Sequence, residues 1–229
     1  MSQLCLALDV PSIERAEALV QSTAHVFDIY KIGLELFSAH GWDGVQRIKA
    51  CGARAIFLDL KLHDIPRTVA RSISAMAHRD VDFLTVHLAG GPEMLKTSQQ
   101  AASETNIKLL GVSILTSLDL ADMDAIGLGT DLVENVMKRC HLAHDAGIYG
   151  VVSSPWEAAR IKSEVGARLC CVTPGIRFAD DAAGDQKRVM TPEKAIENGS
   201  DMLVLGRSVT QANDLSNVLK LLTELKSTL

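Results

Sequence analysis

The chain has 229 residues, of which 47% are apolar, so it can bury a sizeable core as one large domain or two small ones. Its formal net charge of −5 argues against nucleic acid or an anionic membrane as the partner, since both attract basic surfaces. A small anionic ligand is not excluded, because it needs only a local basic site.

The cysteine pattern indicates the compartment. The cysteines are odd in number, include one adjacent pair and show no CxxC spacing; they are Cys5, Cys51, Cys140, Cys170 and Cys171. This is typical of buried thiols in a reducing compartment and not of a disulfide framework or a zinc site. The N-terminus has no basic segment, and no apolar run reaches membrane-spanning length. We therefore expect a soluble cytoplasmic protein.

Eight short apolar runs, each followed by a segment with helical periodicity, extend along the chain. The predicted strands are 4–9, 28–32, 55–60, 83–87, 109–114, 149–153, 169–173 and 202–205. Helix starts are predicted at Ser12, Gly91-Pro92, Ser154-Pro155, Thr191-Pro192 and Asp214. Since no proline-rich linker divides the chain, residues 1–229 are predicted to form a single (β/α)8 TIM barrel, with a doubly wound open sheet as the alternative.

The strand predicted at 55–60 runs into a charged end, Asp59-Leu60-Lys61-Leu62-His63-Asp64. Side chains alternate along a strand, so Asp59 and Lys61 share the face opposite the aliphatic one. Asp64 follows at the turn before Pro66, where it is suited to cap a helix. Three ionisable groups here are costly to desolvate unless they neutralise each other or do chemistry. A structural ion pair with a helix cap is the alternative.

In a (β/α)8 barrel the active face lies at the carboxyl ends of the strands. The polar residues that collect at those ends are Asp9, Lys31, Asp59, Lys61, His87, Thr116, the segment 173–177 and Gly206-Arg207. Lys31, Asp59, Lys61 and Asp64 are predicted to hold one another ionised in a dry pocket, with Lys61 as a positioned proton donor. For Lys31 the alternative is a surface lysine, and His87 is interpreted as a hydrogen-bonded core residue.

A phosphate site is predicted at Gly206-Arg207, because such barrels often bind phosphate after strands seven and eight. Glycine permits close backbone approach and Arg207 adds a bidentate charge; a glycine turn with a surface arginine is the alternative. The polar segment 177–188 is interpreted as a lid that brings Arg177 and Gln186 to the phosphate, or else as a surface loop. No HExxH, GxGxxG or GxxxxGK[ST] motif supports a metal or a nucleotide loop.

Six motifs between Leu8-Asp9 and Val209-Thr210 form a larger pattern: Tyr30-Lys31-Ile32-Gly33, Leu58 to Pro66 with Thr68, Leu115-Thr116-Ser117, Thr173-Pro174-Gly175-Ile176-Arg177, Gly184-Asp185-Gln186 and Gly206-Arg207. With them the sequence resembles the orotidine 5′-monophosphate decarboxylase family, in its bacterial branch. The resemblance implies a homodimeric barrel that converts orotidine 5′-monophosphate to uridine 5′-monophosphate and CO2, finishing pyrimidine nucleotide synthesis. It implies no cofactor and no metal.

The resemblance also implies roles for individual residues. Lys61 protonates C6 of the pyrimidine, and Asp59 lies against the departing carboxylate. Lys31 and Asp9 bind ribose hydroxyls, Lys31 also joins the charged row, and Thr116 meets the pyrimidine edge. The phosphate is held by Arg177, Gln186, Gly206 and Arg207, while the residues that reach the partner subunit's site are Asp64, Ile65 and Thr68.

Two other functions are alternatives. Sugar-phosphate decarboxylases and hexulose-phosphate synthases resemble this chain in an Asp-x-Lys-x-x-Asp strand end but use a divalent metal. A non-catalytic module for a phosphate ligand would keep Arg207 and the lid, but it has no need of Asp59 and Lys61.

Overall fold

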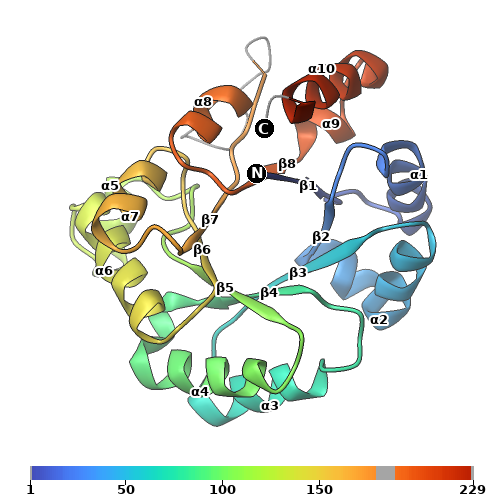
Figure 1. Ribbon diagram of the computed structural model, residues 1–229. Helices are drawn as coiled ribbons and strands as arrows, with labels where there is room; N and C mark the ends of the chain where they lie inside the picture. The colour runs from blue at the N-terminus through green and yellow to red at the C-terminus, as the bar shows by residue number, and fades with distance from the viewer. Residues whose placement is uncertain (1, 179–188, 228–229) are drawn as a thin grey trace.

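The computed structural model describes residues 2–178 and 189–227, whose strands form one closed parallel barrel. Each strand pairs with the next in chain order and β1 also pairs with β8, which closes the ring in Figure 1. The predicted (β/α)8 barrel is therefore confirmed, and the alternative of an open sheet is wrong. The strands are β1 (Gln3–Ala7), β2 (Ile29–Gly33), β3 (Ala55–Leu62), β4 (Phe83–His87), β5 (Lys108–Val112), β6 (Gly150–Val152), β7 (Cys170–Thr173) and β8 (Met202–Leu205).

Helices surround the barrel (Figure 1). They are α1 (Ile13–Thr23), α2 (Leu34–Ala50), α3 (Pro66–Ala75), α4 (Gly91–Ser103), α5 (Leu120–Ala125), α6 (Leu132–Asp145), α7 (Ala158–Glu164), α8 (Pro192–Glu197), α9 (Arg207–Thr210) and α10 (Leu215–Ser227), with a 3-10 turn, η1 (Leu88–Gly90). The predicted strands at 83–87 and 202–205 match the structure, and the ends of the other six differ by at most two residues.

The strands divide their side chains between two apolar clusters, as alternation requires. In β1, Leu4 and Leu6 pack between the strands and the helices, whereas Cys5 and Ala7 belong to the cluster inside the barrel. The rest of the interior cluster consists of Ile29, Phe57, Phe83, Leu110, Cys170, Val172, Met202 and Val204. Because these side chains fill the barrel, polar residues of the same parity at the carboxyl ends face the open mouth.

Most of the predicted helix starts are confirmed. Ser12, Thr191 and Asp214 each accept a hydrogen bond from the backbone N–H three residues further on, and α4 begins at Gly91. These caps satisfy donors that the first helical turn leaves without partners.

One predicted helix start, at Ser154-Pro155, and one predicted helix cap, Asp64, are wrong. α7 begins at Ala158, because the Ser154 hydroxyl accepts the Trp156 N–H within a turn that precedes the helix. Asp64 does not cap α3, because its carboxylate accepts the N–H of the adjacent Ile65 at 2.6 Å and Ile65 takes the N-cap position itself.

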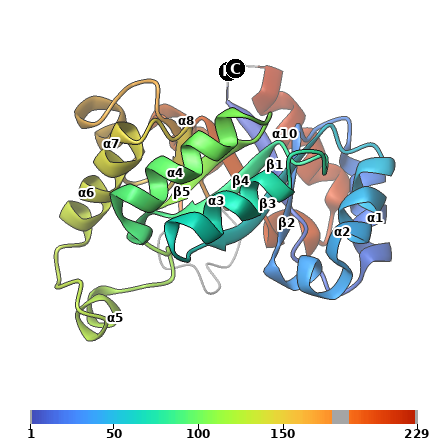
Figure 2. The same cartoon turned by 90° about the horizontal axis from the view of Figure 1, so that it is seen from below.

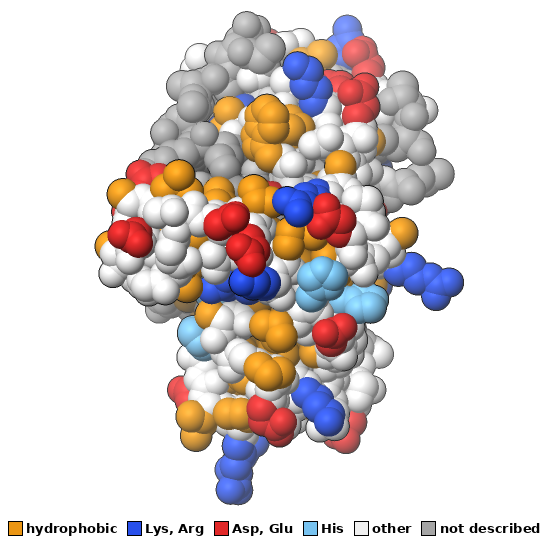
Figure 3. Space-filling view, turned by 90° about the vertical axis from the view of Figure 1, so that its left-hand side faces the viewer, with side chains coloured by type: hydrophobic (Ala, Val, Ile, Leu, Met, Phe, Trp, Pro, Cys, Tyr) orange, Lys and Arg blue, Asp and Glu red, His pale blue; other side chains and the backbone are white. Residues whose placement is uncertain are grey.

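The outer surface mixes side-chain types. Figure 2 shows that α5 projects beyond the barrel, away from the other helices. On the side that carries α5 to α8, Figure 3 shows acidic, basic and apolar side chains interspersed, so the described residues of this face form no broad patch of one charge. Within the described ranges, no helix has the length and hydropathy needed to cross a membrane.

Candidate active site

Four charged side chains from the first three strands line one cavity at the carboxyl end of the barrel. Asp9 follows β1, Lys31 lies in β2, and Asp59 and Lys61 lie in β3. The cavity has a volume of about 400 Å³, and its apolar wall includes the interior side chains Ala7, Phe57, Val172 and Val204. The strand parity that the sequence predicts thus brings the four charges together.

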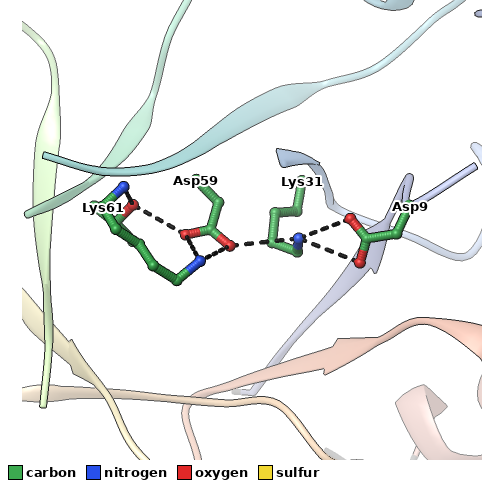
Figure 4. Close-up of polar contacts among 5 residues, drawn as sticks. Asp9, Lys31, Asp59 and Lys61 are labelled. Atoms are coloured by element: carbon green, nitrogen blue, oxygen red, sulfur yellow. Dashed lines mark hydrogen bonds and ion pairs between the residues drawn. The ribbon is translucent and has the colours of Figure 1, made fainter. Parts of the chain in front are cut away.

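The four charges alternate in sign along a row, which Figure 4 shows. Lys61 Nζ lies 3.0 Å from each carboxylate oxygen of Asp59. Lys31 Nζ lies 3.4 Å from Asp59 Oδ2 and 3.1 Å from Asp9 Oδ1. The row is therefore an ion network, in agreement with the alternative of a structural ion pair. It nevertheless lines a cavity that a ligand can enter.

Burial and charge act against each other in this row. The side chains of Lys31 and Asp59 are only 11% and 13% exposed. Burial raises the pKa of Asp59, but Lys31 and Lys61 outweigh it and hold that pKa below its ordinary value. Burial likewise lowers the pKa of Lys31, but Asp59 and Asp9 outweigh it, so that pKa is raised. Both groups stay ionised at neutral pH and present fixed charge to the cavity.

Strand β3 is irregular near its carboxyl end, around Lys61. Leu58 pairs with Leu84 and Leu62 with Val86, so the pairing register with β4 shifts between them. Lys61 has a φ of 50°, a left-handed conformation that costs a non-glycine residue about 1–3 kcal/mol. Bulges re-aim side chains beside active sites. Here the result is an ammonium turned back onto the carboxylate two residues earlier.

A buried threonine that the sequence reasoning missed completes the network. Thr85 of β4 is fully buried, and its hydroxyl donates to Asp59 Oδ1 at 3.0 Å. The same hydroxyl accepts the backbone N–H of Lys61 at 2.8 Å. The signal in the sequence is parity: Thr85 shares a face of β4 with Phe83, which lies inside the barrel.

Glycine at position 33 leaves room for the row. A Cβ there would lie 2.9 Å from Asp9 Oδ1 and 3.2 Å from Lys31 Nζ, and Gly33 pairs with Asp59 across β2 and β3. Any side chain at this position would push apart the ion pair between Asp9 and Lys31. The motif Tyr30-Lys31-Ile32-Gly33 therefore has a steric reason.

Residues after β5, β7 and β8 contribute further polar groups to the cavity. Thr116, Arg177, Gly206 and Arg207 all line it. Arg177 is buried, and its Nη1 donates to the backbone carbonyl of the preceding residue at 3.0 Å and to Ser208 Oγ at 3.4 Å. The arrangement gives one cavity two cationic regions, the lysines of β2 and β3 and the arginines after β7 and β8.

The other predicted site residues that the structure describes lie outside this cavity. Asp64, Ile65 and Thr68 are exposed around the start of α3 and do not line it, so within one chain Asp64 does not join the charged row. Their role in a partner subunit's site stays a prediction. Gln186 and most of the predicted lid lie outside the described residues.

Two histidines, at the carboxyl ends of β3 and β4, stack on each other. The rings of His63 and His87 lie 5.2 Å apart at 17°. His87 Nδ1 accepts the Ala89 N–H, and burial, followed by the charge of His63, lowers the pKa of His87. His87 is hydrogen-bonded, as predicted, but it is only half-buried and not a core residue. Among the described side chains, no group of three or more His, Cys, Asp or Glu is placed to hold a metal ion.

Fold and cavity together define a class of protein: a (β/α)8-barrel enzyme that presents fixed charges of both signs to a substrate at the carboxyl ends of its strands. Comparison with known proteins narrows this class. The family model described as "Orotidine 5'-phosphate decarboxylase / HUMPS family" matches residues 2–222, and the chain belongs to this family.

Similar proteins agree with that assignment. An orotidine 5'-phosphate decarboxylase of Ehrlichia canis is 41% identical over 208 residues, covering 91% of this chain and 90% of the relative. One from Thermobifida fusca is 43% identical over 211 residues, covering 92% and 90%. Among solved structures, the orotidine 5'-phosphate decarboxylase of Lactobacillus acidophilus superposes with a TM-score of 0.82 at 31% identity and covers 98% of both chains.

Proposed function

We propose that this chain decarboxylates orotidine 5′-monophosphate to uridine 5′-monophosphate and CO2, with Lys61 as the proton donor to C6. The activity, that of a carboxy-lyase in uridine 5′-monophosphate synthesis, follows from the family and from relatives that are about 40% identical over nine tenths of the chain. The role of Lys61 rests on one observation: its ammonium lies in a cavity, 3.0 Å from a carboxylate held by a second ammonium.

Fixed charge suits this reaction. Loss of CO2 from C6 leaves a carbanion whose electron pair no adjacent π-system delocalises. An ammonium beside C6 stabilises the developing negative charge and then delivers its proton to the same carbon. Each tenfold gain in rate requires about 1.4 kcal/mol, so a preorganised charge is needed. Asp59, itself paired with Lys31, holds Lys61 in that orientation, and the chemistry requires neither a cofactor nor a metal.

The other charged residues position the substrate. Asp59 faces the departing carboxylate, where repulsion between the two adds ground-state destabilisation. Asp9 and Lys31 bind ribose hydroxyls. Asp9 is the exposed end of the charged row, and its 56% accessible side chain supports a contact with the substrate. Thr116 contacts the pyrimidine edge.

The phosphate binds at Arg177, Gly206 and Arg207, with Gln186 from the lid. Arginine matches phosphate geometry with two parallel hydrogen bonds, which supports this part of the proposal. The phosphate is remote from C6, so its binding energy aligns the ring and lowers the barrier as well as KM.

The active enzyme is proposed to be a homodimer with shared sites, formed by residues 1–229 as one catalytic domain in the cytoplasm. Exposure of Asp64, Ile65 and Thr68 at the start of α3, outside the cavity of their own chain, supports a role in a partner's site. Free thiols at all five cysteines support a reducing compartment.

A turnover assay tests the proposal. Purified protein mixed with orotidine 5′-monophosphate should change the ultraviolet absorbance of the pyrimidine, with and without a chelator. No conversion in the absence of added metal would count against the proposal. Turnover of a ketose phosphate that a chelator abolishes would favour the metal-dependent sugar-phosphate enzymes, and tight nucleotide binding without turnover would favour a binding module.

A further inference from the structure

One buried hydroxyl joins the two residues at the centre of the proposed chemistry. Thr85 Oγ1 lies 3.0 Å from Asp59 Oδ1 and 2.8 Å from the backbone nitrogen of Lys61. A hydroxyl has one proton to donate and lone pairs that accept. Because Asp59 is ionised and the Lys61 N–H is a donor, the direction of both hydrogen bonds is determined. The hydroxyl donates to Asp59 and accepts from Lys61.

The irregular pairing of β3 with β4 explains why this hydroxyl is needed. Between Leu58 and Leu62 the register with β4 shifts, and a bulged residue loses its ordinary ladder partner. A buried N–H without a partner is costly. The side chain of Thr85 supplies the acceptor that the strand ladder does not, at the residue whose φ of 50° turns the ammonium into the cavity.

Thr85 is also the stiffest of the three side chains that hold Asp59. The other two, Lys31 and Lys61, are long and rotate about several bonds. A β-branched threonine in a strand is restricted at χ1, and Thr85 is fully buried. The orientation of the Asp59 carboxylate is therefore fixed by a side chain anchored on β4, and not only by flexible ammonium groups.

From these contacts we propose that Thr85 is a positioning residue for the decarboxylation, setting the Asp59 carboxylate and the Lys61 backbone from one hydroxyl. The inference rests on the proposed roles of Lys61 and Asp59. Thr85 contacts no substrate in this account. It acts through the two residues that do.

Removal of the hydroxyl should therefore affect the chemical step more than binding. In Thr85→Val the shape is kept, but Asp59 loses a donor and the Lys61 N–H loses its acceptor. We expect kcat to fall about 10- to 100-fold while KM changes by less than about threefold, because the phosphate residues are untouched. Thr85→Ser keeps the hydroxyl and should return kcat to within about threefold of wild type.

A pH profile adds a readout that a purely structural role would not move. The charged and titratable groups around Asp59 are Lys31 on β2, Lys61 on β3 and Cys5 on β1, and Asp9 lies on the far side of Lys31. A hydrogen bond donated to a carboxylate favours the ionised form, so its loss raises the pKa of Asp59. The acid limb of kcat against pH should therefore move to higher pH in Thr85→Val and return in Thr85→Ser.

Ser153→Ala is the matched control. Ser153 at the end of β6 is also buried, and its hydroxyl has no hydrogen-bond partner among the described residues. Its removal should leave kcat and the acid limb unchanged. Circular dichroism and binding of uridine 5′-monophosphate establish that each variant is folded, and Thr85→Ala replaces Thr85→Val if the valine variant does not fold.

The outcomes separate this inference from the proposed function. Loss of kcat with an unchanged KM, rescue by serine and a shifted acid limb would support it. A hydroxyl-free variant with wild-type kcat and acid limb, beside an inactive Lys61→Ala, would overturn the role of Thr85 alone. An active Lys61→Ala would overturn the proposed proton donor, and the inference with it.

Discussion

Asp59 and Lys61 lie two residues apart on strand β3, and the Lys61 ammonium lies 3.0 Å from both carboxylate oxygens of Asp59. Regular alternation puts them on one face, and the left-handed backbone of Lys61 turns the amine inward. The carboxylate is shared with Lys31 at 3.4 Å. Two cations on one buried anion form a preorganised charge array, which an enzyme needs when charge develops in the transition state.

The first prediction concerns Lys61→Ala. The substitution removes the proposed charge beside C6 and the proposed proton donor together, so we expect kcat to fall at least about 10⁴-fold. The fold should survive, because the side chain is 32% exposed and Asp59 keeps its contacts with Lys31 and Thr85. Turnover by ultraviolet absorbance and circular dichroism of the same sample measure both effects.

A control for that experiment is Lys138→Ala. Lys138 is an exposed lysine on α6 that pairs with Glu134, away from the cavity, so its loss should leave kcat unchanged. Near-normal turnover by Lys61→Ala would reject the assigned role.

The second prediction concerns stability in acid. Because the folded-state pKa of Asp59 lies below its ordinary value of 3.8, ionised Asp59 contributes stability at neutral pH. That contribution is lost as the pH falls from 3.8 through the folded-state pKa. The free energy of unfolding of wild type should therefore fall more steeply in this acid range than that of Asp59→Asn. Urea unfolding of both proteins at about pH 7 and about pH 3 makes the comparison, and parallel decreases would contradict it.

Much of this site could be predicted from the sequence, because its main determinants are local. Apolar runs and helical periodicity indicate the strands and helices, and strand parity places Asp59 and Lys61 on one face. The orientation of Asp64 could not be predicted in this way. Its carboxylate accepts the adjacent Ile65 N–H instead of capping α3. Both hydrogen bonds are local, and the sequence does not show which of them forms.

The role of Thr85 was missed for a different reason. It depends on a register shift between β3 and β4. This shift joins Lys61 and Thr85, 24 positions apart in the chain, and pairing register is a tertiary property. Strand parity alone places Thr85 inside the barrel. It does not reveal that a bulge leaves the Lys61 N–H facing it.

The third prediction concerns Gly33→Ala. The new Cβ would lie 2.9 Å from Asp9 Oδ1 and 3.2 Å from Lys31 Nζ, so the ion pair must shift. Asp9 and Lys31 are proposed to bind the ribose, so displacing them should lower kcat/KM at least about tenfold. Gly166→Ala is the control, because its Cβ would meet only the exposed ring of His144, at 3.1 Å, which can rotate away. Equal kcat/KM values for the two variants would contradict the steric argument.

The fourth prediction concerns Arg207→Ala, assayed with two substrates. With orotidine 5′-monophosphate, loss of the proposed charge-assisted phosphate contact should lower kcat/KM about 10- to 100-fold. With orotidine, which has no phosphate, wild type and variant should be equally slow. Arg160→Ala, on the surface of α7 and paired with Glu164, controls for a general loss of positive charge. An equal loss on both substrates would place Arg207 outside the phosphate site.

The last prediction concerns shared sites in the proposed homodimer. Asp64 is exposed and outside its own cavity, whereas Lys61 lies inside it. If Asp64 completes the site of the partner subunit, Asp64→Ala and Lys61→Ala homodimers are each nearly inactive. A mixed dimer then has one site with both defects and one intact site. After equal mixing and subunit exchange, about a quarter of wild-type activity should return. Sedimentation and mass spectrometry of differently tagged chains confirm exchange, and exchange without recovered activity would show that each chain forms its site alone.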